Sequence, residues 1–174
     1  MNQRHRIAIG LGANLGDRAE TLKKAAALLA EDLLEDAKAS SLYESKPWGI
    51  TDQPDFLNAV MTGYTDFKPP AIVNLLKEME RALGRTVTIK NGPRVIDLDL
   101  ICYGEEVWNL EGVQVPHPGM AQRDFVLLPL SEVWPEWKDP KTSKSVKELL
   151  ATLHKTEPLS SSKVGVLPLG TKTP

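Results

Sequence analysis

Hydrophobic residues recur every three or four positions in two stretches of the chain, a spacing typical of amphipathic helices. The first stretch follows Asp17 and Glu20, which resemble a capping box, and its predicted inward face is Leu22, Ala25, Ala26, Leu29 and Leu33. The second stretch follows Pro69 and Pro70, and its predicted inward face is Ile72, Leu75, Leu76, Met79 and Leu83. Proline is tolerated in the first turn of a helix and glycine follows many helix ends, so we expect the second helix to end at Gly84.

Shorter apolar runs predict four strands, over residues 6–11, 39–45, 56–65 and 94–103. Together with the two helices they give the order strand, helix, strand, strand, helix, strand. This order predicts the α+β class with a ferredoxin-like βαββαβ core, in which an antiparallel sheet has both flanking helices on one face.

The chain after residue 103 is less regular, and we expect it to add C-terminal elements to this core. A short helix is predicted over residues 120–128, with Pro129 interrupting it, and Ser143 is predicted to cap a final helix. Residues 157–174 are rich in Ser, Pro, Gly and Lys, which favours a loose tail. The predicted functional domain therefore covers residues 1–156.

Composition narrows the functional classes. The 174 residues fit one domain, and 21 basic and 23 acidic residues give a net charge of −2. No nucleic-acid partner is expected from this balance, although a small polyphosphate ligand needs only a local basic patch. The apolar stretch near the N-terminus is too short for a signal peptide or a membrane span. The single cysteine, Cys102, lies in an apolar run and is expected to be a buried thiol, which fits a reducing cytoplasm. We expect the protein to be a monomer.

Asp97 and Asp99 are two residues apart in the strand predicted over residues 94–103, so both side chains should emerge from one face of the sheet. Two carboxylates at that spacing repel each other, and burying them costs free energy unless cations compensate. Mg²⁺ is a suitable cation because it binds one or two carboxylates together with substrate phosphates. The alternative is a pair of surface aspartates on a solvated face, and the spacing alone leaves this open.

Five basic side chains lie near this pair in the sequence or soon after it, namely Arg85, Lys90, Arg94, His117 and Arg123. Cations that converge on paired carboxylates suit a site for a metal-bound polyphosphate. Individual members also have simpler interpretations. Arg85 could cap the second helix, Arg123 could be an exposed helix residue, and His117 could be fixed between two prolines as part of a turn.

Two further features concern ligands with rings. The run from Gly10 to Gly16 suggests a dinucleotide site but lacks the required glycine spacing, so we interpret it as a tight turn between a strand and a helix. A nicotinamide-dependent enzyme is therefore weakly supported. Trp48, Phe56 and Asn58 indicate a different ligand, because aromatic rings and one amide can bind a flat heterocycle by stacking and by edge hydrogen bonds.

Several motifs occur in the order found in one enzyme family. They are residues 10–18 (GLGANLGDR), 43–49 (YESKPWG), 52–58 (DQPDFLN), 92–100 (GPRVIDLDL) and 115–118 (VPHP). In these motifs the chain resembles the 6-hydroxymethyl-7,8-dihydropterin pyrophosphokinases, and the resemblance extends over about residues 6 to 137. It implies transfer of pyrophosphate from ATP to the hydroxymethyl group of the reduced pterin, with release of AMP, in folate biosynthesis.

The resemblance also implies residue roles. Asp97 and Asp99 would hold two Mg²⁺ ions that bridge the triphosphate, and Arg85 and Arg94 would support the transferring phosphates. The implied ATP contacts are Lys77, Glu80, Arg94, Leu100, His117 and Arg123, to which the position of the preceding loop adds Lys90. The implied pterin pocket consists of Ser45, Pro47, Phe56, Asn58 and Phe125, to which the reasoning above adds Trp48.

A silent ferredoxin-like binding module is the alternative, since this fold serves many proteins that are not enzymes. The presence of Asp97, Asp99, Arg94 and His117 together favours the enzyme. The loop over residues 86–91 is one residue shorter than in the enterobacterial members of the family and lacks their arginine and tryptophan. We expect this polar loop to be mobile without ligand.

Overall fold

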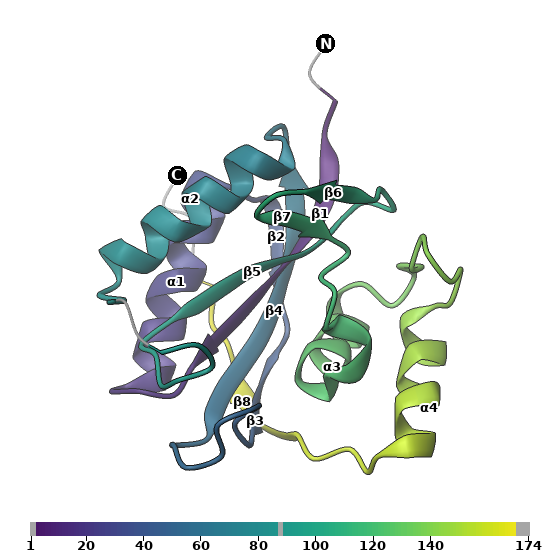
Figure 1. Cartoon of the computed structure of the whole chain (residues 1–174). Coiled ribbons are helices and arrows are strands. Elements are labelled where there is room, and N and C mark those ends of the chain that lie inside the picture. Colours follow the sequence, from purple (N-terminus) through teal and green to yellow (C-terminus); the bar gives the residue numbers. More distant parts are fainter. Residues whose placement is uncertain (1–2, 87–88, 170–174) are drawn as a thin grey trace.

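The computed structural model describes residues 3–86 and 89–169, and at its centre these residues form a six-stranded antiparallel sheet (Figure 1). The hydrogen-bonded order is β5-β1-β4-β3-β8, and β2 also pairs with β4. The strands are β1 (His5–Ala13), β2 (Glu35–Ala39), β3 (Ser41–Ser45), β4 (Phe56–Thr65), β5 (Asp97–Tyr103) and β8 (Ser162–Val166). A separate hairpin consists of β6 (Trp108–Leu110) and β7 (Val113–Val115).

Helices cover both faces of the sheet (Figure 1). On one face lie α1 (Arg18–Asp32) and α2 (Pro69–Ala82). On the other lie the short 3₁₀ helix η1 (Met120–Gln122), α3 (Asp124–Val133) and α4 (Val146–Thr156). Side chains alternate along β1, so that Ile7 and Ile9 pack beneath α1 and α2 whereas Ala8 packs beneath α3. The predicted combination of helices with an antiparallel sheet is confirmed.

Both predicted helices form with the expected inward faces. The Asp17 carboxylate accepts the N–H of Glu20 at 3.2 Å and caps α1, whose predicted inward residues are all buried. Gly84 follows α2 with a φ of +99°, a conformation that glycine adopts without steric cost. In the predicted α2 stripe Ile72, Leu76 and Met79 are buried, whereas Leu75 and Leu83 are partly buried against the same core.

Two predicted strands differ from the structure. The strand predicted over residues 39–45 is two strands, β2 and β3, whose register against β4 differs by one residue, as at a bulge. Ser40 spans the break, because its N–H donates to Val60 O and its Oγ accepts from Val60 N, both at 2.9 Å. The strand predicted over residues 94–103 begins only at Asp97, since the backbone of Arg94 pairs instead with Asn14.

The helices after residue 103 also require correction. Pro129 does not interrupt a helix but lies inside α3, because Leu127 and Leu130 on either side of it are fully buried. This packing outweighs the one backbone hydrogen bond that proline cannot donate. Ser145 rather than Ser143 caps α4, since only Ser145 is followed at the right spacing by Glu148, with which it forms a capping box.

The prediction of a loose tail is wrong for residues 162–166, which form β8. This strand pairs with β3, and the following Leu167 is only 3% exposed in the core beneath α1 and α2. The predicted boundary at residue 156 therefore separates a strand from the sheet to which it belongs. Residues 170–174 of the tail and residues 87–88 of the predicted mobile loop lie outside the described residues. Within residues 3–86 and 89–169, no helix is long and apolar enough to cross a membrane.

We expect Ser145→Ala to lower the free energy of unfolding by about 1 kcal/mol, because Ser145 Oγ accepts the N–H of Glu148 in the first turn of α4. Ser143→Gly is the matched control. Ser143 has a φ of +60°, so glycine there should leave stability unchanged or raise it slightly. Urea denaturation of both variants measures the difference, and equal losses would show that Ser145 is not the effective cap.

Candidate active site

Three cavities share walls around the start of β5. The aromatic cavity is lined by residues that include Trp48, Phe56, Asn58, Arg123 and Phe125. The helix cavity is lined by residues from α2, from β5 and from the segment after β7, including Lys77, Glu80, Leu100 and His117. The loop cavity is lined by residues that include Lys77, Arg85, Lys90 and Arg94. Asp99 lines both the aromatic and the helix cavity, and Arg94 lines both the aromatic and the loop cavity.

Two glycines of β1 leave space beside the carboxylate pair. In the antiparallel ladder between β5 and β1, Asp97 is opposite Gly12 and Asp99 is opposite Gly10. A methyl group added at Gly12 would lie 3.2 Å from Oδ1 of Asn58. The lack of side chains at these positions therefore keeps the sheet surface open between the carboxylates and Asn58.

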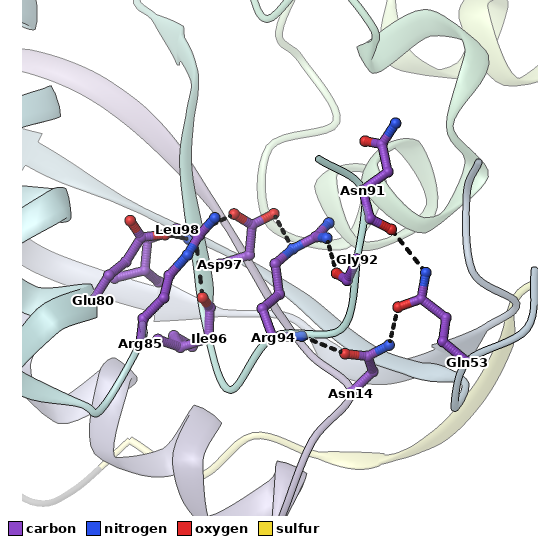
Figure 2. Close-up of polar contacts among 10 residues, drawn as sticks. All are labelled: Asn14, Gln53, Glu80, Arg85, Asn91, Gly92, Arg94, Ile96, Asp97 and Leu98. Carbon is purple, nitrogen blue, oxygen red and sulfur yellow. Dashed lines mark hydrogen bonds and ion pairs between the residues drawn. The ribbon is translucent and has the colours of Figure 1, made fainter. Parts of the chain in front are cut away.

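Asp97 contacts two arginines (Figure 2). Arg85 Nη1 donates to Asp97 Oδ1 at 2.9 Å, and Arg94 Nε lies 3.4 Å from Asp97 Oδ2. Arg85 Nη1 also donates to Glu80 at 2.5 Å, and the same Glu80 oxygen accepts the N–H of Leu98 at 2.8 Å. Arg85 thus links α2 to the start of β5, which goes beyond the capping role that its position alone allows.

Asp99 has a different environment. Burial, together with the nearby carboxylates of Asp97 and Glu80, holds the pKa of Asp99 well above its usual range, although Arg123 and Arg94 partly offset this effect. In the described part of the chain, the ion pairs of Arg85 and Arg94 are with Glu80 and Asp97 and not with Asp99. Asp99 is therefore the carboxylate that has most to gain from an added cation.

His117 presents a defined donor to the helix cavity. The backbone N–H of Gly119 donates to His117 Nδ1 at 3.1 Å, so the neutral ring carries its proton on Nε2. Burial, and to a lesser extent the positive charge of Arg123, lowers the pKa of His117. The ring is consequently neutral at pH 7 and has one N–H available for a ligand.

The amide of Asn58 is held in a fixed orientation within the aromatic cavity. Asn58 and Ser45 are both buried, and Asn58 Nδ2 donates to Ser45 Oγ at 2.7 Å. The Phe56 ring lies beside them, and its centre is 4.8 Å from Cζ of Arg94. The guanidinium of Arg94 therefore contacts both an aromatic ring of this cavity and the carboxylate of Asp97.

Arg123 occupies the opposite side of the aromatic cavity. Its Cζ lies 5.6 Å from the centre of the Trp48 ring and 5.8 Å from that of Phe125. A methyl group added at Gly119 would lie 3.0 Å from Arg123 Nε, so glycine at that position lets the guanidinium pack against the backbone. Arg123 Nε is buried and has no hydrogen-bond partner among the described residues, which leaves this group oriented by its aromatic neighbours.

The structure brings the predicted residues together with one exception. Pro47 does not line any of the three cavities but a fourth one, which it shares with Trp48, Phe125 and the C-terminal segment. Trp48 lines both the aromatic cavity and this fourth cavity, and it is 48% exposed. The remaining predicted residues line at least one of the three cavities, with Lys77 and Lys90 at exposed positions on their walls.

Three residues that were not predicted as site residues connect the segments that form the site (Figure 2). They are Asn14, Gln53 and Asn91. Asn14 is 2% exposed; its Oδ1 accepts the N–H of Arg94 at 2.9 Å and its Nδ2 donates to Gln53 Oε1 at 2.8 Å. Gln53 Nε2 in turn donates to Asn91 O at 2.8 Å. Asn14 and Gln53 occur in two of the motifs noted above, which was the available signal for a role.

The glycine-rich run from Gly10 to Gly16 was predicted to be a tight turn between a strand and a helix, and only its last part is such a turn. Gly10 and Gly12 lie within β1, and only Gly16, with a φ of +66°, lies between that strand and α1. Gly10 and Gly12 instead keep the sheet surface open beside Asp97 and Asp99.

An antiparallel α+β fold in which paired carboxylates and arginines adjoin an aromatic cavity has the groups suited to a phosphorylated ligand beside a ring compound. The model of the 7,8-dihydro-6-hydroxymethylpterin-pyrophosphokinase (HPPK) family matches residues 8–135. The chain belongs to this family.

Relatives named 2-amino-4-hydroxy-6-hydroxymethyldihydropteridine pyrophosphokinase occur in several bacteria. The Aquifex aeolicus protein is 40% identical over 142 residues, which are 82% of this chain and 88% of the relative. The Bacillus subtilis protein is 40% identical over 136 residues, which are 78% of this chain and 81% of the relative. These similarities establish the chain as a pyrophosphokinase of the folate-synthesis family.

Solved structures support the fold at lower sequence similarity. A Plasmodium falciparum HPPK-DHPS structure (A437G, with SDX-DHP) matches with a TM-score of 0.72 at 15% identity, over 89% of this chain and 46% of that chain. The wild-type Plasmodium falciparum HPPK-DHPS structure matches with a TM-score of 0.71 at 13% identity, over 94% of this chain and 48% of that chain. This chain therefore spans about half the length of those structures.

The two aspartates should affect the ligand-free protein in opposite directions. Because the folded-state pKa of Asp99 is raised, its ionised form destabilises the fold, and that penalty grows as pH rises from the usual carboxyl range toward the raised value. We expect Asp99→Asn to raise the free energy of unfolding at pH 8 by on the order of 1–3 kcal/mol, and by less at pH 5.

Asp97→Asn is the matched comparison. It weakens the contacts with Arg85 and Arg94, so it should lower the free energy of unfolding by about 1 kcal/mol at pH 8. Urea denaturation in the presence of a chelator measures both variants. Shifts of the same sign in the two variants would contradict this division between a paired and an unpaired carboxylate.

Proposed function

We propose that this chain transfers pyrophosphate from ATP to the hydroxymethyl group of 6-hydroxymethyl-7,8-dihydropterin and releases AMP, as a step of folate biosynthesis. The observation that carries this proposal is that two chemically different cavities meet at Asp99. One is aromatic with a buried amide, and the other contains cations and a neutral histidine. The names of the bacterial relatives support the same substrate.

The aromatic cavity is assigned to the pterin. The buried amide of Asn58, oriented by Ser45, can bond to the edge of the ring, while Phe56 and Phe125 supply stacking surfaces. Trp48 closes the outer side, together with Arg123. Pro47, which lines the neighbouring cavity, contributes through the shape of its loop rather than by lining this one.

The helix and loop cavities are assigned to ATP. The helix cavity offers the N–H of His117, and the loop cavity offers Lys90 and the exposed ammonium of Lys77, which both cavities share. Glu80 holds Arg85 in place and closes the end of α2. The remaining assigned contacts are Leu100 and Arg123.

In the proposed reaction, the hydroxymethyl oxygen bonds to the β-phosphorus while the bond from that phosphorus to the oxygen bridging the α-phosphate breaks, so AMP leaves. A primary alcohol is a weak nucleophile, and the enzyme must therefore supply position and charge. Arg94 lines both the aromatic and the loop cavity, Arg85 lines the loop and the helix cavity, and their planar guanidinium groups match phosphate oxygens. We assign them, with Asp97 and Asp99, as the catalytic residues.

The carboxylate pair fits divalent metal. Asp97 and Asp99 share one face of β5, and Asp99 is a half-buried carboxylate for which the described residues supply no ion-paired cation. We infer that the pair holds two Mg²⁺ ions, which when bound neutralise phosphate charge. No group of three or more His, Cys, Asp or Glu side chains in the described residues could hold a metal by itself. Two protein carboxylates therefore leave the remaining ligand positions to phosphate and water.

The finer structural assignments follow the same reasoning. We infer a ferredoxin-like core formed by β1, α1, the β2–β3 pair, β4, α2 and β5, which is supported by the strand order β5-β1-β4-β3. The assigned catalytic domain extends beyond residue 156 to Leu167, because β8 belongs to its sheet and Leu167 to its core. We also assign a cytoplasmic monomer, and the buried free thiol of Cys102 fits the reducing conditions of a cytoplasm.

Incubation with ATP, Mg²⁺ and the reduced pterin should yield AMP in equal amount to the pterin diphosphate, as measured by anion-exchange chromatography. ADP as the only nucleotide product would leave a kinase possible but exclude a pyrophosphokinase. An unchanged ATP pool would instead support the silent binding module.

Asn58→Ala tests whether the aromatic cavity binds the pterin while the helix and loop cavities bind ATP. Loss of the ring-edge bond should weaken pterin binding by about 1–3 kcal/mol, or roughly tenfold to a hundredfold, and leave binding of a non-hydrolysable ATP analogue nearly unchanged. Calorimetry measures both ligands, and an equal loss for both would assign Asn58 a structural role.

A further inference from the structure

The C-terminal segment over residues 157–167 follows the matched family region, which ends at residue 135. It begins after α4, crosses toward the sheet, forms β8 against β3 and ends with Leu167 in the core beneath α1 and α2. It therefore passes from one face of the sheet to the other around the edge at β3, as Figure 1 shows for the last part of the chain.

A single buried carboxylate holds this segment to the site. Asp124 is 9% exposed, and its Oδ2 accepts the backbone N–H groups of Ser160 at 2.7 Å and of Ser161 at 2.8 Å. Its Oδ1 accepts the hydroxyl of Ser161 at 2.8 Å. Three short hydrogen bonds to one charged acceptor form a strong connection between the start of α3 and the C-terminal segment.

The position of Asp124 in the chain gives this connection a consequence for the site. Its immediate neighbours are Arg123 and Phe125, both of which line the aromatic cavity. The guanidinium of Arg123 contacts the rings of Trp48 and Phe125 and contributes to the electrostatic environment of Asp99. A shift at Asp124 would displace both neighbours, because they belong to the same turn of backbone.

The C-terminal segment also lies next to Trp48 and Phe125, which line the aromatic cavity. The fourth cavity is lined on one side by residues 45–48 and on the other by Pro158, Leu159 and Ser160. Trp48 and Phe125 separate it from the aromatic cavity, since both residues line the two cavities. The segment is thus placed behind the two aromatic side chains that enclose the ring ligand.

We propose that residues 157–161 are the outer support of the pterin site, and that Asp124 is a positioning residue which sets the affinity for the ring substrate through Arg123 and Phe125. This inference rests on the proposed function, because it takes the aromatic cavity as the pterin site. The helix and loop cavities have no wall formed by this segment. The segment therefore affects ATP only through Arg123, which is one of several assigned ATP contacts.

The test compares Asp124→Asn and Ser161→Ala with Asp139→Ala in the full-length protein. Asp139 is a matched control, because its carboxylate also accepts a backbone N–H and a hydroxyl, from Lys141 and Thr142, but it lines none of the described cavities. Calorimetry with the reduced pterin, in the presence of Mg²⁺ and a non-hydrolysable ATP analogue, measures ring affinity, and a separate titration measures the analogue alone.

Asp124→Asn should weaken pterin binding about tenfold and Ser161→Ala about threefold, while the double variant should be no weaker than Asp124→Asn, because the two residues act through one connection. Analogue binding should weaken by no more than about twofold in every variant, because Arg123 is only one of several assigned ATP contacts. Unchanged pterin affinity in Asp124→Asn, or a loss equal to that in Asp139→Ala, would overturn the proposal. Failure of the wild type to bind pterin would instead overturn the proposed function.

Discussion

Repulsion between Asp97 and Asp99 is the constraint on which the rest of the site depends. The pleat of β5 places both carboxylates on one face, where two negative charges can be kept only if positive charge is supplied. The structure distributes this positive charge unevenly between the two carboxylates. Arg85 and Arg94 pair with Asp97, whereas the half-buried Asp99 beside it has no such ion pair among the described residues. This uneven charge in the ligand-free state fits the proposed binding of a cation together with a polyphosphate.

The placement of those arginines depends in turn on packing at a distance from the site. Arg85 is held by Glu80 at the end of α2, and α2 is held by its buried stripe against the sheet. Arg94 is held through its backbone by Asn14 at the end of β1. The cationic side of the site is therefore assembled from the core beneath α1 and α2. The aromatic side is assembled from β3, β4 and the start of α3, which pack partly in the other core.

Much of this arrangement could be predicted from the sequence, because its signals are local. The apolar stripe of α2 and the same-face spacing of Asp97 and Asp99 need only a helical or strand period. The missed features depend on tertiary contacts. The bulge at Ser40 requires knowledge of its partner strand, and β8 lies in a stretch whose polar composition resembles a linker. The role of Asn14 depends on a loop that is 80 residues away in the chain.

The positions of Gly10 and Gly12 set a limit on how stable this protein can become. Glycine within a strand is unfavourable by roughly 0.5–1 kcal/mol relative to alanine, and β1 carries two in the middle of the sheet. Replacing them is a standard route to a more stable variant. At Gly12, however, the added methyl group would press on Asn58 Oδ1 and narrow the aromatic cavity. A substitution that stabilises the strand at this position would therefore act against ligand binding in the proposed pterin cavity.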